Sequence, residues 1–152
     1  MSIGLFIQTY LKRHYLHEPF WRLWNELNNL EKRFYTIFSE ELFYGRRLNN
    51  FLKPTITSLA EIKSAVSETS ASLPDNHLKE EAKTACKLLN RNIDMISTTL
   101  KSLEKDDEER IQIKDISFEK FRKELLFASV QITKTETAVR RCMQNRKNVQ
   151  MQ

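Results

Sequence analysis

The sequence predicts an all-α protein, an elongated antiparallel bundle of three long helices with coiled-coil-like packing and a short N-terminal helix. Its 152 residues include only two glycines, Gly4 and Gly45, so few positions favour tight turns. Apolar residues recur at spacings of three and four over long stretches, which is the period of an amphipathic helix. No stretch shows the alternation of apolar and polar residues that is typical of a half-buried strand.

The first expected element is an amphipathic segment over residues 1–18. Glu18-Pro19 ends it, because proline disfavours helix in the preceding residue and suits the first turn of the next helix. The apolar run is too short to span a bilayer, and no basic region or cleavage site marks it as a signal peptide. Its apolar residues at helical spacing are Ile3, Phe6, Ile7, Tyr10 and Leu11.

The second element is an aromatic-rich segment over residues 19–72. Its stripe predicts one helix from Phe20 to about Leu52, after which Pro54 either kinks this helix or opens the next. Residues 64–72 are rich in serine and threonine and weaken the helical pattern. The apolar positions are Phe20, Leu23, Trp24, Leu27, Leu30, Phe34, Ile37, Phe38, Tyr44, Leu48, Phe51, Leu52, Ile56, Leu59, Ile62 and Val66.

Two further helices complete a single predicted domain over residues 1–152. The turn at residues 73–76 (LPDN) precedes a helix within residues 75–105, and Ser117 can cap a last helix over residues 117–147. The last helix carries the strict spacing of a coiled-coil or bundle seam. The two stripes are Leu78, Ala82, Ala85, Leu89, Ile93, Ile96, Leu100 and Leu103, then Phe118, Phe121, Leu125, Ala128, Ile132, Thr135, Val139 and Cys142.

Charge distribution limits the classes of partner. The net charge is +5, and residues 117–152 hold eight basic and three acidic side chains. Nucleic-acid binding is not expected, because no dense basic stripe is interleaved with aromatic residues. An anionic membrane surface fits better, with the amphipathic N-terminal segment lying in the interface. The candidate residues for an anionic surface are Lys12, Arg13, Arg46, Arg47, Arg140 and Arg141.

Catalytic and metal chemistry is not expected. Cys86 and Cys142 fall on apolar stripes, which predicts reduced core thiols in a protein of the cytosol or nucleus, and a cytoplasmic location is expected. His14 and His17 are three residues apart but lack the further ligands that a zinc site needs. No phosphate-binding loop, nucleophile motif or calcium loop is present in the sequence. We therefore predict no enzyme activity, no metal and no cofactor.

The aromatic residues suggest where a partner binds. They concentrate in the first third of the chain and spread around the helix cylinder, so they form either the wide side of an intramolecular core or a binding surface. We predict a non-catalytic interaction module, scaffold or adaptor that binds itself, as a homodimer, or another helical protein. The predicted interface residues are Trp21, Trp24, Phe34, Phe38, Tyr44, Phe121, Leu125 and Ile132.

Parts of the chain also resemble known helical families. Residues 20–52 (FWRLWNELNNLEKRFYTIFSEELFYGRRLNNFL) look like the opening of a BAR-type membrane-curving domain, and SFEKFRKELLFASVQ resembles a later helix of such domains. That resemblance implies an antiparallel dimer with a basic concave face that includes Arg46 and Arg47, and hence peripheral membrane binding as the alternative function. Residues 73–131 are equally similar to a BAG-type chaperone-regulator bundle and to the N-terminal bundle of a syntaxin, so the chain is assigned to none of these families.

Overall fold

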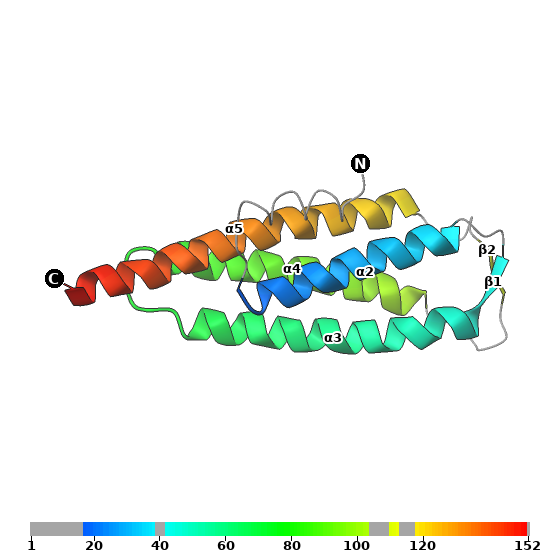
Figure 1. The fold of residues 1–152 in the computed structure, drawn as a ribbon, viewed down its shortest axis with the longest axis horizontal. Helices are drawn as coiled ribbons and strands as arrows, with labels where there is room; N and C mark the ends of the chain where they lie inside the picture. The colour runs from blue at the N-terminus through cyan, green and yellow to red at the C-terminus, as the bar shows by residue number, and fades with distance from the viewer. Residues whose placement is uncertain (1–16, 39–41, 104–109, 113–117, 152) are drawn as a thin grey trace.

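The computed structural model describes residues 17–38, 42–103, 110–112 and 118–151, with side chains for residues 17–34, 50–103 and 119–145. Four long helices dominate this part of the chain, and they are labelled as in Figure 1. In chain order the elements are α2 (Phe20–Phe38), β1 (Leu42–Tyr44), α3 (Gly45–Ala71), α4 (Lys79–Ser102), β2 (Arg110–Gln112) and α5 (Phe118–Met151).

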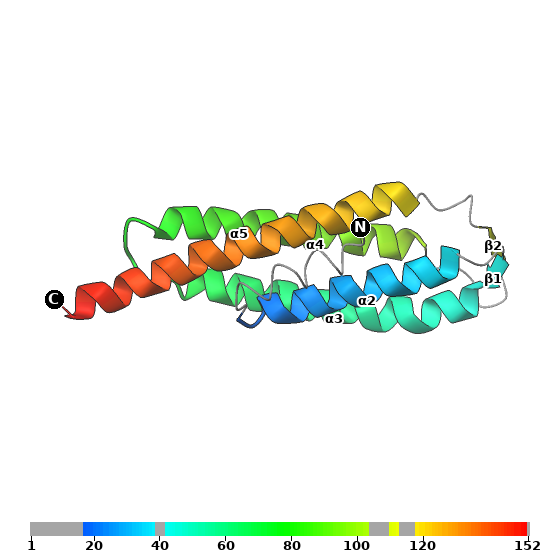
Figure 2. The same ribbon diagram turned by 45° about the horizontal axis from the view of Figure 1, so that its top comes forward.

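The four helices form an elongated up-and-down bundle (Figures 1 and 2). Each helix packs mainly against two neighbours: α2 lies against α3 and α5, and α4 lies against the same two helices. Successive helices run in opposite directions, which buries an apolar stripe from each of them in one shared core. The predicted all-α antiparallel bundle is therefore confirmed.

The number of long helices differs from the prediction. The helix expected from Phe20 to Leu52 is wrong, because α2 ends at Phe38 and the chain turns back into α3 at Gly45. Helices α2 and α3 then lie side by side, with the Ser58 hydroxyl donating a hydrogen bond to Glu26 at 2.7 Å. Described stripe residues of both helices, such as Leu30 and Leu52, are buried in the same core. The opening helix that resembles a BAR domain is thus split into a hairpin.

A short antiparallel ladder lies at one end of the bundle, where β1 pairs with β2 (Figure 1). The register aligns Leu42 with Gln112 and Tyr44 with Arg110. The ladder joins the α2–α3 connection to the α4–α5 connection, although the sequence shows no alternating pattern there. The expectation that no strand forms is therefore wrong for these two three-residue strands.

Helix α3 continues through two features that were expected to disturb it. Pro54 lies inside the helix, and the hydroxyl of Thr55 donates to the carbonyl of Phe51 at 2.7 Å. In the serine-rich stretch, Thr69 bonds back to the carbonyl of Ala65 at 2.9 Å. Hydroxyls in such a stretch can be satisfied by the preceding turn, so a serine-rich composition did not end this helix.

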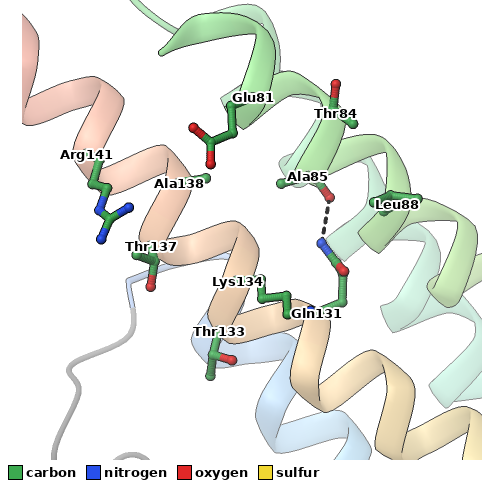
Figure 3. Close-up of a pocket in the computed structure, with 10 residues that line it drawn as sticks. All are labelled: Glu81, Thr84, Ala85, Leu88, Gln131, Thr133, Lys134, Thr137, Ala138 and Arg141. Carbon is green, nitrogen blue, oxygen red and sulfur yellow. Dashed lines mark hydrogen bonds between the residues drawn. The ribbon is translucent and has the colours of Figure 1, made fainter.

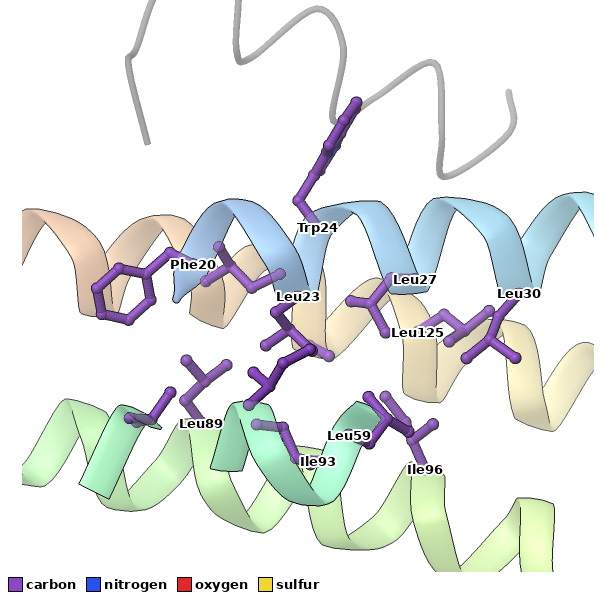
Figure 4. Close-up of a cluster of buried hydrophobic side chains, with 14 of the residues drawn as sticks. Phe20, Leu23, Trp24, Leu27, Leu30, Leu59, Leu89, Ile93, Ile96 and Leu125 are labelled. Atoms are coloured by element: carbon purple, nitrogen blue, oxygen red, sulfur yellow. The ribbon is translucent and has the colours of Figure 1, made fainter. Parts of the chain in front are cut away.

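Among the side chains that the structure describes, most of the predicted stripe positions are buried in the core. Figure 4 shows its central part, where side chains of α2 meet those of α3, α4 and α5. The seam of α5 is buried at each predicted position from Phe121 to Cys142. The largest fully buried side chains are Phe20, Phe34, Phe121, Leu23, Leu27, Leu30, Leu52, Leu59, Ile62, Leu89 and Ile93.

Candidate protein-interaction surface

A groove follows the outer side of the α4–α5 pair and has a volume of about 490 Å³ (Figure 3). We call it the α4–α5 groove. Its lining mixes small, apolar and charged side chains, and Figure 3 shows them arising from both helices. The lining residues are Glu81, Thr84, Ala85, Leu88, Gln131, Thr133, Lys134, Thr137, Ala138 and Arg141.

Two polar contacts fix α4 against α5 along this groove. The Ala85 carbonyl accepts hydrogen bonds from the Thr135 hydroxyl at 3.0 Å and from the Gln131 amide at 3.3 Å. Further along, the hydroxyl of Thr99 donates to Glu124 at 2.8 Å. These contacts fix which residues of the two antiparallel helices lie at the same level.

An apolar strip continues the groove between the two contacts. Met95 lies one turn before Thr99, and Phe127 lies one turn after Glu124, so the register brings them to the same level. Met95 is 52% exposed and Phe127 is 64% exposed. Leu88 lies two turns before Met95 on the same side of α4 and is 42% exposed. The strip is thus made by Leu88, Met95 and Phe127, on a surface where no described element covers them.

Charged side chains border the groove that the apolar strip continues. Glu81 lies at one end of the groove on α4, and Lys134 and Arg141 lie on α5 (Figure 3). Apolar side chains surrounded by charges of both signs are typical of protein interfaces, which have an apolar centre and a polar rim.

Most predicted interface residues lie inside the bundle. Trp24, Phe34, Phe121, Leu125 and Ile132 are buried, and the Phe34 and Phe121 rings lie 4.6 Å apart between centroids. An interface made of these side chains would need the bundle to open. Trp21 is 40% exposed. The side chains of Phe38 and Tyr44 lie outside those that the structure describes.

The predicted basic residues do not gather at one described site. Arg140 forms an ion pair with Glu136 at 3.3 Å on its own helix, whereas Arg141 is exposed and lines the α4–α5 groove. Lys12 and Arg13 lie outside the described residues, and so do the side chains of Arg46 and Arg47. Binding of an anionic membrane surface stays a prediction.

The thiols have the environment of core residues. Cys86 is buried, and loss of solvation raises its pKa to about 11, with a hydrogen bond to Ser70 as a smaller opposing effect. A thiol with so high a pKa is a poor nucleophile at neutral pH. Cys142 is also buried and donates to Asn76 at 3.5 Å. Among the described residues, no group of three or more histidine, cysteine, aspartate or glutamate side chains could hold a metal ion.

The exposed strip was missed by sequence reasoning, although a signal for it exists. Met95 and Phe127 lie next to stripe positions Ile96 and Ala128 rather than on the stripes. A large apolar residue one step off a regular seam cannot enter the core without breaking its spacing. That offset marks such residues as candidates for a surface.

The fold and this surface define a four-helix bundle with an exposed apolar groove. No protein-family model, curated protein or solved structure matches the chain. None of the helices in the described part of the chain is both long enough and apolar enough to cross a membrane.

Proposed function

We propose that this chain is a non-catalytic helical interaction module, and that it pairs with a second copy of itself through the α4–α5 groove. The observation that carries the proposal is the apolar strip of Leu88, Met95 and Phe127, which lies exposed between two polar contacts. Large side chains exposed in a row on one face are typical of an interface rather than of a solvated helix surface.

The composition of the groove supports self-association. A two-fold axis places the same surface on both sides of an interface, so such a surface must complement itself. The groove carries Glu81 as well as Lys134 and Arg141, and therefore offers both signs of charge to an identical groove. We place the two-fold axis between Leu88 and Met95, so that the grooves of the two copies run antiparallel. The end of the groove at Arg141 in one copy then lies toward the Glu124 end of the other.

The expected affinity is modest. Complete burial of a leucine, methionine or phenylalanine side chain contributes about 1.5–3 kcal/mol. The three side chains of the strip are already about half buried, so each would contribute roughly 1 kcal/mol on pairing. The strip alone would give a weak dimer, and the rest of the α4–α5 face must add to it.

Sedimentation equilibrium over a wide range of protein concentration tests this proposal. The native chain is expected to shift from monomer to dimer, and Phe127→Asp is expected to stay monomeric because it places a charge on the strip. Met143→Asp is the matched control, since Met143 is also an exposed apolar residue of α5 but lies about 160° from Phe127 around the helix and does not line the groove. Equal association of the two variants would reject the groove as the interface. A native chain that stays monomeric throughout would reject self-association and leave a different helical protein as the partner.

A further inference from the structure

Met95 gives the apolar strip a chemical reactivity that Leu88 and Phe127 lack. It is 52% exposed, and peroxides oxidise the methionine thioether to a sulfoxide. The thiols compete poorly for the same oxidant. Cys86 and Cys142 are both buried, and burial raises the pKa of Cys86 to about 11, so little of its reactive thiolate forms at neutral pH. Peroxide therefore reaches the sulfur of Met95 more readily than either thiol.

The proposed pairing puts Met95 close to the middle of the interface. Leu88 and Met95 are seven residues apart on α4, which is a rise of about 10 Å, so each lies about 5 Å along the helix from the two-fold axis. In the antiparallel arrangement Met95 of one copy faces Leu88 of the other, and the symmetry repeats this contact. The centre of an interface is its most apolar and most completely dehydrated part.

We propose that Met95 is a modification site, and that its oxidation to methionine sulfoxide separates the two copies. This control rests on the proposed self-association through the α4–α5 groove. Hydrogen peroxide transfers one oxygen atom to the sulfur lone pair, so that an S–O bond forms, the O–O bond breaks and water leaves. The sulfur is oxidised by two electrons and the peroxide is reduced by two.

The sulfoxide weakens the pairing because its oxygen needs a hydrogen-bond donor. In water the solvent supplies one, whereas Leu88 of the other copy offers only carbon atoms. A buried acceptor without a donor destabilises the state in which it is buried, and the symmetry makes this happen twice in each dimer. Because Met95 lies outside the core of the monomer, its oxidation leaves the bundle itself folded.

The coupling also operates in the other direction. A second copy that covers Met95 shields its sulfur from peroxide, so pairing slows the oxidation that would prevent pairing. Met143 supplies a reference in the same molecule. It is 41% exposed on α5, and it lies about 160° from Phe127 around that helix, so the proposed pairing leaves it uncovered.

Oxidation rates at these two methionines test the shielding. The native chain is treated with a large excess of hydrogen peroxide at two protein concentrations, one far below and one far above its dimerisation midpoint, and sulfoxide is measured by peptide mass spectrometry. The ratio of the Met95 rate to the Met143 rate is expected to be several-fold lower in the dimer. An equal ratio at both concentrations would overturn the proposal.

Sedimentation equilibrium after oxidation tests the effect on pairing. The dissociation constant of the oxidised native chain is expected to rise by about tenfold or more. Met95→Leu is expected to pair before and after peroxide treatment, and the matched variant Met143→Leu is expected to lose its pairing as the native chain does. Met1 and Met151 are present in every variant, so their oxidation cancels in the comparison. Equal loss of pairing in the two variants would overturn the proposal.

Two further readouts separate the possible failures. Treatment with the methionine sulfoxide reductases specific for the two sulfoxide epimers is expected to restore pairing, and no recovery would overturn the assignment to methionine. Far-UV circular dichroism is expected to be the same before and after oxidation, and a loss of helix would mean that unfolding separates the copies. A native chain that is monomeric before oxidation rejects self-association itself. A chain that pairs equally well before and after oxidation rejects only the control by Met95.

Discussion

Truncation of Phe34 is the sharpest test of the core. Its side chain is fully buried, and its ring contacts Phe121 at 4.6 Å and Phe51 at 5.8 Å in an edge-on arrangement. Replacing a buried phenylalanine with alanine costs about 3–5 kcal/mol, which includes the cavity that remains. The two ring pairs place Phe34→Ala near the upper end of that range. A domain of this size is stable by about 5–15 kcal/mol, so the loss should be a large part of the total.

Phe127→Ala is the control for this measurement. The same change of residue type is made in a helix, so the gain in helix propensity is similar and cancels in the comparison. Because Phe127 is mostly exposed, its truncation should change the free energy of unfolding by no more than about 0.5 kcal/mol. Urea unfolding followed by far-UV circular dichroism gives both values, at a protein concentration low enough to keep the chain monomeric.

The comparison has a clear adverse outcome. Equal losses for the two variants would mean that Phe127 is packed inside the monomer, which would remove the apolar strip from the surface. A loss below about 1 kcal/mol for Phe34→Ala would mean that the site is not a packed core position.

Two further predictions concern the polar contacts and the thiol. Thr135→Val should lower the free energy of unfolding, measured by urea titration, by about 1–2 kcal/mol, because it removes the buried hydrogen bond to Ala85. The control is Thr133→Val, which should change this free energy by less than about 0.5 kcal/mol, because the hydroxyl of Thr133 bonds to Val130 of its own helix. Equal effects of the two substitutions would contradict this reasoning. Burial raises the Cys86 pKa from 9.0 to about 11, so as pH rises the thiol of the unfolded chain loses its proton before that of the folded chain. Between these pH values the native sequence should therefore lose stability relative to Cys86→Ala, by an amount of the order of 2–3 kcal/mol. Free energies of unfolding that change in parallel with pH for the two proteins would refute this prediction.

The bundle could be predicted because its helices show their buried faces in the sequence. The stripe of α4 is buried from Ala82 to Leu103, and that of α5 from Phe121 to Cys142. The turn between α2 and α3 could not be predicted from periodicity. Leu42 follows Phe38 by four residues and Leu48 follows Tyr44 by four, so the apolar spacing resumes with little interruption on both sides of the turn, and Gly45 is the single glycine that marks it. Periodicity reports which face of a helix is buried, but not where the chain reverses.

The candidate surface was harder to predict than the core. Sequence reasoning selected the large apolar residues on the stripes, and the structure buries those such as Phe34 and Leu125. The exposed strip depends on the alignment of α4 with α5, which brings Met95 beside Phe127. Alignment between distant helices is not encoded in the spacing within either one, so this juxtaposition required the structure.

The side-chain contacts to α5 have a consequence for how uniquely the chain folds. A stripe with spacings of three and four nearly repeats after seven residues, so α5 could slide along its neighbours by about 10 Å and still bury an apolar seam. Directional bonds distinguish these alignments. Thr135 bonds to Ala85 near the middle of the seam, and the Asn76 amide bonds to the carbonyl of Cys142 at 3.1 Å near its end. In a shifted alignment the hydroxyl of Thr135 would be buried without this acceptor. The bonds therefore select one alignment among several that hydrophobic packing alone would leave almost equal in energy.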